Sequence, residues 1–261
     1  MIDLGLTGRH ALVTGAGIGI GRATAVWLAR AGCDVALVDI DGAALTDAAA
    51  AVRAEGTRVH TITADLRDPD AVRAMVADVE ATLGPLDVAV NNVGSLGGRA
   101  TMPFLDADDD WLRGIVELNL LVTMYCCQAE ARAMVGAGTR GVIVNVSSGE
   151  STRPSLNMAP YGAAKAGINS LTATLAVELG PAGIRVVAVA PGTTLTPVVA
   201  SVLDDATVAR LEAAHPLGRL TEPDDLARVI VAVASDLGGA VTGSLVFGDN
   251  GAHLSRNRPA L

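Results

Sequence analysis

Short runs of β-branched and other apolar residues alternate along this chain with longer amphipathic segments, and this alternation constrains the fold more than any other feature. Four to six consecutive apolar residues indicate strands that are buried on both faces, as in a parallel sheet. The pattern predicts strands at residues 10–14, 34–39, 58–63, 86–91, 142–146, 184–189 and 244–247, and helices near 19–31, 42–55, 69–83, 107–136, 160–180 and 223–236. Alternation of this kind without an intervening linker predicts a single doubly wound α/β domain.

Helix start signals support these boundaries. Asp68 followed by Pro69 predicts an N-cap with proline in the first turn, and Thr221 ahead of Pro223 predicts another helix start. The last ten residues, 252–261, carry no periodic pattern. We therefore expect a domain over residues 1–251 and a C-terminal tail over 252–261.

The composition excludes several classes of protein. Half of the 261 residues are apolar and the net charge is −9, which argues for a sizeable core and against a nucleic-acid partner. The longest uncharged stretch, 186–203, is interrupted by prolines, so no membrane association is expected. Three cysteines, two of them adjacent, favour a reduced cytoplasmic protein over a disulfide framework. The sequence contains no Cys/His cluster of the kind that would predict a metal site.

In a doubly wound sheet, ligands bind at the carboxyl ends of the strands. After the first predicted strand the chain is rich in glycine, and the segment runs Gly15, Ala16, Gly17, Ile18, Gly19, Ile20, Gly21. Glycines at a strand-to-helix turn let the backbone approach a pyrophosphate, which the helix N-terminus attracts. The strict G-x-G-x-x-G spacing is absent, so a plain tight turn is the alternative. Its position in a βαβ unit favours a dinucleotide site.

Asp39 ends the second predicted strand, 18 residues after Gly21. A carboxylate there can accept hydrogen bonds from ribose hydroxyls and would repel a 2′-phosphate. No basic residue stands at position 40 or within the glycine segment. The sequence therefore favours NAD over NADP, the alternative being an ordinary solvated aspartate at a strand end.

Tyr161 and Lys165 are four residues apart at the start of a predicted helix and so share one face. Lys165 is the single lysine among 19 basic residues, which suggests a position that needs a compact ammonium. That ammonium, with an oxidised nicotinamide ring nearby, would bring the pKa of Tyr161 toward neutrality. Ser147 and Ser148 follow the fifth predicted strand, where a hydroxyl would hold a substrate oxygen. Tyr125 has no basic residue at this spacing and is expected only to pack.

Taken together, these motifs resemble the short-chain dehydrogenase/reductase family over nearly the whole chain. The matching segments are Thr14-Gly15-x-x-x-Gly19-x-Gly21, Asn91-Asn92-Val93-Gly94, Ser148, Tyr161-x-x-x-Lys165 and Pro191-Gly192. The resemblance implies a Rossmann fold with a seven-stranded parallel sheet, usually in homodimers or homotetramers. Apolar residues on more than one face of the segment 106–135 are a weak physical hint of such an interface.

The resemblance also implies roles for individual residues. Tyr161 would be the acid/base, Lys165 would bind the nicotinamide ribose, Ser148 would orient the substrate oxygen and Asn119 would hold a proton-relaying water. Further cofactor contacts are expected at the strand ends, namely at Asp65, Leu66, Asn92, Gly94, Pro191, Gly192, Thr194 and Thr196. Four positions depart from the family pattern, and these are Val93, Ala190, Thr194 and Asn250.

The expected reaction is the interconversion of a secondary alcohol and a ketone by hydride transfer. A lid over residues 193–215, with an apolar wall and a short helix capped near Asp204, suits a hydrophobic or cyclic substrate. Glu150 and Arg153 would contact a polar substrate group or pair with each other. The first alternative is a 3-oxoacyl-(acyl-carrier-protein) reductase, suggested by Pro216-Leu217-Gly218-Arg219. The second is a cofactor-binding regulator without turnover.

Overall fold

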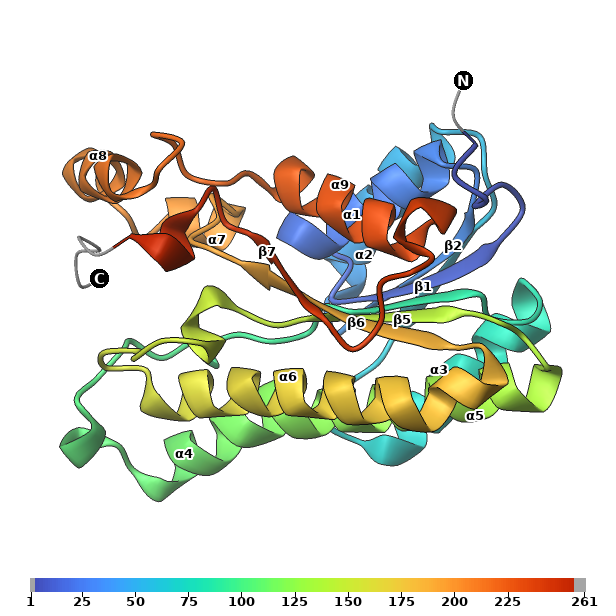
Figure 1. Ribbon diagram of the computed structural model, residues 1–261, viewed down its shortest axis with the longest axis horizontal. Helices are drawn as coiled ribbons and strands as arrows, with labels where there is room; N and C mark the ends of the chain where they lie inside the picture. Colours follow the sequence, from blue (N-terminus) through green and yellow to red (C-terminus); the bar gives the residue numbers. More distant parts are fainter. Residues whose placement is uncertain (1–2, 256–261) are drawn as a thin grey trace.

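A seven-stranded, all-parallel sheet runs through the centre of the computed structural model, which describes residues 3–255 (Figure 1). The strand order is β3-β2-β1-β4-β5-β6-β7. The strands are β1 (His10–Thr14), β2 (Asp34–Asp39), β3 (Val59–Thr63), β4 (Val88–Asn91), β5 (Val142–Val146), β6 (Arg185–Pro191) and β7 (Leu245–Gly248). This confirms the predicted fold class. Several strand ends differ by one or two residues; β6, for example, extends to Pro191, which pairs in register with Gly248.

Helices cover both faces of the sheet (Figure 1). One face is covered by α1 (Gly19–Arg30), α2 (Gly42–Arg53) and α9 (Pro223–Ala234). The opposite face is covered by α3 (Pro69–Thr82), α4 (Asp109–Val116), α5 (Val122–Ala137) and α6 (Ala159–Leu179). Strand β1 pairs with both β2 and β4, so the strand order reverses there and opens a crevice at the carboxyl ends of these strands.

The predicted lid contains two helices, α7 (Pro197–Ala200) and α8 (Asp205–Ala214). As expected, Asp204 caps α8, and its carboxylate accepts a hydrogen bond from the Thr207 N–H at 2.8 Å. In Figure 1, α7 and α8 lie at the same end of the molecule as the first turns of α4 and α6.

The helical stretch predicted near 107–136 is present over 109–137, but it is not a regular α-helix, because a π-helical turn at Glu117–Leu121 lies between α4 and α5. In a regular α-helix the carbonyl of Ile115 would accept the backbone N–H of Asn119. Here it accepts a hydrogen bond from the side-chain amide of Asn119 at 3.0 Å. The side chain thus bonds within the widened turn.

α9 begins at Pro223, as predicted, but the start signal expected at Thr221 falls one residue later. Glu222 is the N-cap, and it forms a reciprocal capping box with Asp225. The Thr221 hydroxyl instead donates to the Thr193 carbonyl at 3.0 Å and lies 2.9 Å from the Thr194 hydroxyl. Asp68 caps α3 as predicted.

Residues 252–261, predicted as a patternless tail, begin with a 3₁₀ turn, η6 (Ala252–Leu254), in which Ala252 is buried. The part of this tail from 256 onward lies outside the described residues. Within residues 3–255, every helix is too short or too polar to span a bilayer. The same residues bring together no three His, Cys, Asp or Glu side chains that could hold a metal.

Candidate active site

The glycine-rich turn after β1 is packed so closely that side chains would not fit. Gly15 and Gly19 have φ of +62° and +57°, which favour glycine. A Cβ on Gly21 would lie 2.0 Å from the Gly15 carbonyl, and one on Gly17 would lie 3.0 Å from the Asp39 carboxylate. The N-cap of α1, Ile18, provides no side-chain hydrogen bond. The first N–H groups of α1 therefore remain available to an anion.

Two strand ends hold this turn in place. The Asn92 side-chain amide donates to the carbonyls of Thr14 and Gly15 at 3.2 and 3.0 Å. Asp39, at the end of β2, accepts hydrogen bonds from the N–H groups of Gly17 and Asp41 at 2.9 and 3.1 Å. Asp39 thus lies beside the glycine turn, as the sequence predicted, with its carboxylate fixed by backbone donors. Ile20 packs against the apolar core and leaves only its backbone to the turn.

The residues that follow β3 give less specific evidence for a cofactor site. Asp65 is partly exposed and forms an ion pair with Arg67 at 2.5 Å, and this hydrogen bond lowers the pKa of Asp65. Leu66 is buried in the core under α3, so its side chain is not available to a ligand. The contact of Asp65 with a cofactor stays a prediction.

The four residues predicted to carry the chemistry lie at the ends of β4 and β5. Lys165 is buried, and its ammonium donates to the Val146 carbonyl at 2.9 Å and lies 5.7 Å from the centre of the Tyr161 ring. A Cβ on Gly94 would lie 2.6 Å from Asn119 Oδ1 and 2.9 Å from Lys165 Nζ. The fourth residue, Ser148, interacts with Tyr161 through a hydrogen bond.

Asn119 presents a buried acceptor at this site. Its amide nitrogen donates to the carbonyls of Ser95 and Ile115 at 2.8 and 3.0 Å. Its Oδ1 is buried, and no donor from the described residues reaches it. A buried acceptor without a donor is costly, so a polar ligand or water fits beside Gly94.

Burial dominates the protonation of both titratable groups. It lowers the pKa of Lys165 to about 8. It raises the pKa of Tyr161, while the hydrogen bond with Ser148 lowers that pKa and the charge of Glu150 raises it. This upward direction is opposite to the one expected from the ammonium alone, because desolvation of the phenolate outweighs the distant positive charge.

The turn that carries Ser148, η3 (Gly149–Ser151), is clamped to α6 by an amide that the sequence analysis missed. Ser147 Oγ donates to Asn169 Oδ1 at 2.6 Å, and Asn169 Nδ2 donates to Ser151 Oγ at 2.8 Å. Ser151 Oγ in turn donates to the Ser148 carbonyl at 2.5 Å. The signal was available, because Asn169 follows Lys165 by four residues and so lies on the same helical face.

The segment after β6 closes the other side of the crevice. Gly192 packs against Asp249, and a Cβ on Gly192 would lie 2.9 Å from that of Asp249. Thr194 is buried, and its hydroxyl donates to the Gly192 carbonyl at 3.1 Å. Thr196 caps α7 and lies beside the glycine turn, 3.2 Å from a Cβ placed on Gly19. This position would allow Thr196 to contact a ligand bound at the N-terminus of α1.

Comparison with known proteins agrees with this geometry. The family model described as enoyl-(acyl carrier protein) reductase matches residues 15–253. A cis-4-hydroxycyclohexanecarboxylate dehydrogenase of Sinomonas cyclohexanicum is 40% identical over 243 residues, covering 93% of this chain and 96% of that protein. A short-chain dehydrogenase/reductase of Aspergillus oryzae is 37% identical over 253 residues, covering 95% and 96%.

Among solved structures, a 7α-hydroxysteroid dehydrogenase in complex with NADH and 7-oxo glycochenodeoxycholic acid superimposes with a TM-score of 0.90. It is 29% identical in sequence, and the match covers 95% of this chain and 96% of that one. Fold, full-length similarity and the grouped serine, tyrosine and lysine point the same way. The chain belongs to the short-chain dehydrogenase/reductase family and is an oxidoreductase acting on CH–OH groups.

Proposed function

We propose that this enzyme uses NAD to interconvert a hydrophobic or cyclic secondary alcohol and its ketone. The observation that carries the proposal is the grouping of Ser148, Tyr161, Lys165 and Asn119 next to Gly94, two residues after the asparagine that holds the glycine turn. The cofactor and the kind of substrate rest on separate arguments, which follow.

The turn after β1 fits a dinucleotide. Cβ atoms on Gly17 and Gly21 would fill the space next to Asp39 and Gly15, and α1 has no side-chain cap to compete for an anion. Bound NAD would supply the carbon that accepts or returns the hydride. Asp39 supports NAD over NADP, because a fixed carboxylate at the ribose position would repel a 2′-phosphate and Ile40 offers no charge to neutralise it.

In the proposed reaction Tyr161 takes the hydroxyl proton of the alcohol during oxidation and returns it to the carbonyl oxygen during reduction. Ser148 holds the same oxygen through its hydroxyl. Lys165 contributes a positive charge that favours the phenolate, and burial has lowered its pKa to about 8, so that charge diminishes above this pH. Asn119 Oδ1 provides the acceptor for a relaying water beside Lys165.

Apolar side chains at the same end of the molecule as the predicted lid support a hydrophobic substrate. Phe104 and Leu105 are exposed in η1 (Phe104–Asp106). Leu156 is exposed in a neighbouring loop, and this loop lies beside the segment before η1 because the Met102 N–H donates to the Asn157 carbonyl at 3.1 Å. On the opposite side, Val198 is exposed in α7. The relatives named for a cyclohexane ring and a steroid are consistent with such a substrate.

A carrier-protein reductase is the second candidate, and the description of the matching family model favours it. An acidic carrier protein would need positive charge near the end of α6. There the chain presents exposed Val177 and Glu178, and no basic residue follows in sequence before Arg185. One basic side chain, Arg140, does reach this end of α6, because a Cβ placed on Gly183 would lie 2.7 Å from its Nε. We rank the carrier-protein substrate second because the carboxylate of Asp39 favours NAD over NADP.

We further propose a homodimer or homotetramer in the cytoplasm. Exposed Met124 and Val135 on α5 and Val177 on α6 support an interface on these helices. The three cysteines are buried and free, which suits a reducing compartment. Sedimentation of the purified protein would measure the oligomeric state, and a monomer at micromolar concentration would contradict the first part of this proposal.

The function is tested with NAD or NADP and a panel of aliphatic, cyclic and steroidal secondary alcohols, following the absorbance of the reduced nicotinamide. The Tyr161→Phe variant serves as the blank. We expect turnover with NAD and a cyclic or hydrophobic alcohol. Turnover restricted to NADP would overturn the argument from Asp39. Tight NADH binding without turnover on any alcohol would favour the non-catalytic regulator.

A further inference from the structure

Arg153 and Glu150 form an ion pair in the turn that follows Ser148. Arg153 Nη2 lies 3.5 Å from Glu150 Oε1, and the two side chains are 17% and 10% exposed. By contrast, the arginine and aspartate of the surface pair Arg113–Asp109 are 78% and 81% exposed. Burying two charges costs desolvation free energy that their mutual attraction does not always offset, whereas an exposed pair carries little such cost. A buried pair therefore suggests a role beyond stability.

The other side of the Arg153 guanidinium reaches the C-terminal turn. Its Nη1 donates to the Ala252 carbonyl at 2.8 Å, across 99 residues of sequence. That turn is itself fixed by buried Asp249, which accepts the His253 N–H at 2.7 Å and lies 3.0 Å from the His253 ring nitrogen Nδ1. The ring of His253 stacks on Phe247, with centroids 3.9 Å apart.

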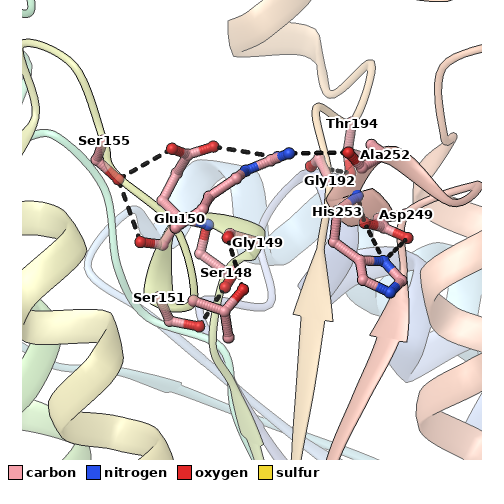
Figure 2. Close-up of polar contacts among 12 residues, drawn as sticks. Ser148, Gly149, Glu150, Ser151, Ser155, Gly192, Thr194, Asp249, Ala252 and His253 are labelled. Carbon is pink, nitrogen blue, oxygen red and sulfur yellow. Dashed lines mark hydrogen bonds and ion pairs between the residues drawn. The ribbon is translucent and has the colours of Figure 1, made fainter. Parts of the chain in front are cut away.

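Figure 2 shows the two sides of this contact. Residues of the segment from Ser148 to Ser155 lie on one side, and Gly192, Asp249, Ala252 and His253 lie on the other. Dashed contacts run from the Glu150 carboxylate to the guanidinium of Arg153 and from that guanidinium to the Ala252 carbonyl. The bridge passes over the turn of the catalytic serine. A Cβ on Gly149 would lie 3.3 Å from Arg153 Nη2 and 3.4 Å from the Pro191 carbonyl.

The same pair lies next to Tyr161. The Glu150 carbonyl is 3.2 Å from a Cβ placed on Gly162, and Ser155 Oγ donates to both the carbonyl and the carboxylate of Glu150 at 3.1 and 2.9 Å. The charge of Glu150 raises the pKa of Tyr161. The charged groups facing Tyr161 are Glu150 from η3 and Lys165 from α6, and Arg153 acts on it through Glu150.

We infer that Arg153 is a positioning residue, which ties the Ser148 turn to the C-terminal turn and neutralises Glu150 beside Tyr161. It has two separable effects. The hydrogen bond to Ala252 holds the Ser148 turn against the C-terminal turn. The ion pair with Glu150 offsets part of the negative charge beside the phenol. The inference rests on the proposed acid–base role of Tyr161, and its first readout does not require turnover.

That readout is the absorbance of tyrosinate during a pH titration. The chain has two tyrosines, Tyr125 and Tyr161, so subtracting the titration of Tyr161→Phe isolates Tyr161. In Arg153→Gln, Glu150 loses its ion pair with the guanidinium, and we expect the pKa of Tyr161 to rise by about one pH unit. In the double variant Glu150→Gln/Arg153→Gln the carboxylate charge is gone, and the pKa of Tyr161 should fall to that of the wild type or below it.

The second readout is amide hydrogen exchange of the segment 249–255. All three changes, Arg153→Gln, Arg153→Lys and the double variant, should speed exchange there about tenfold, because none retains both contacts of the guanidinium fork. Arg153→Lys keeps the charge and should leave the Tyr161 titration near that of the wild type. Arg113→Gln, which removes an exposed pair, is the matched control and should change neither readout.

With a substrate in hand, Arg153→Gln should lower kcat about tenfold near pH 7 and recover part of that loss at higher pH, whereas the double variant should mainly raise KM. A Tyr161 titration unchanged in Arg153→Gln, with exchange also unchanged, would overturn the inference. If the wild-type protein turned over no alcohol while the Arg153→Gln variant still changed both readouts, the proposed function would be contradicted and the role of Arg153 would stand. Melting curves of each variant establish that it is folded.

Discussion

The two faces of the sheet are built differently. Under α1, α2 and α9 the core is formed by valine, leucine and alanine, with Leu28 and Leu37 among its fully buried side chains. Under α3, α5 and α6 the core is also aliphatic, but a buried carboxylate and two buried amides lie within it. The first face holds the sheet together, and the second face also carries the helix with Tyr161 and Lys165.

The polar groups of the second face form one connected cluster. Asn91 Nδ2 donates to Glu130 Oε2 at 2.9 Å and to Asn145 Oδ1 at 3.1 Å, and Asn145 Nδ2 donates to Thr172 Oγ1 at 3.1 Å. Burial raises the pKa of Glu130 to about 7. Directional bonds fix the register of β4 and β5 more tightly than apolar contacts do.

This difference has a consequence at the active site. Asn91 and Asn145 are register partners, and the residues that follow them in the chain hold the glycine turn and the Lys165 ammonium. Changes in the buried core of the apolar face, away from the glycine turn at the start of α1, should therefore alter stability alone. Changes on the polar face should alter chemistry, pH dependence or both.

The largest effect is expected on the polar face at Tyr161. Tyr161→Phe removes the group that we propose exchanges a proton with substrate, and we expect kcat to fall at least about 1,000-fold. The melting temperature and NADH affinity should stay close to those of the wild type. Turnover within tenfold of the wild type would refute the acid–base role.

On the apolar face, Leu28→Ala leaves a cavity in α1 and should cost about 3 kcal/mol of unfolding free energy. Because no polar group of the active site contacts this position, kcat per folded molecule should be unchanged. Urea unfolding together with active-site titration would measure both quantities. A fall in kcat comparable to the loss of stability would erase the distinction between the two faces.

Glu130→Gln tests the pH dependence of the polar face. Glu130 has a pKa of about 7 in the folded protein and 4.5 as its ordinary value, so the folded state binds the proton more tightly. Its contribution is fully present below pH 4.5 and is lost as the pH rises through 7, by roughly 3 kcal/mol. Glutamine keeps an acceptor for Asn91 and does not ionise.

The Gln variant should therefore gain stability relative to the wild type between pH 5 and pH 8. Urea unfolding of both proteins at the two pH values measures this gain. Parallel pH profiles for the two proteins would show that the pKa of Glu130 is the same in the folded and unfolded states.

The smallest effect is expected at Asn169. Aspartate at this position can accept from Ser147 but cannot donate to Ser151, so the clamp on the Ser148 turn loses one hydrogen bond. A bond of this kind corresponds to about a tenfold fall in kcat. Ser170→Ala, at the exposed neighbouring position, is the control, and steady-state kinetics of both variants decides the matter.

The linear pattern of residues was enough to predict the succession of strands and helices along the chain, the glycine turn and the spacing of Tyr161 and Lys165. These features depend on local periodicity, backbone freedom and residues four apart on one helix, which a linear pattern records directly. Asp39 likewise lies where the end of a predicted strand placed it.

Other features follow from contacts between segments that are distant in sequence. In the π-helical turn Asn119 bonds to Ser95 and Ile115, and the Thr221 hydroxyl, expected to start α9, contacts Thr193 and Thr194. Arg153 meets Ala252 across 99 residues. Contacts between distant segments leave no period in the sequence, because each partner satisfies its hydrogen bonds only after the sheet has brought the two together.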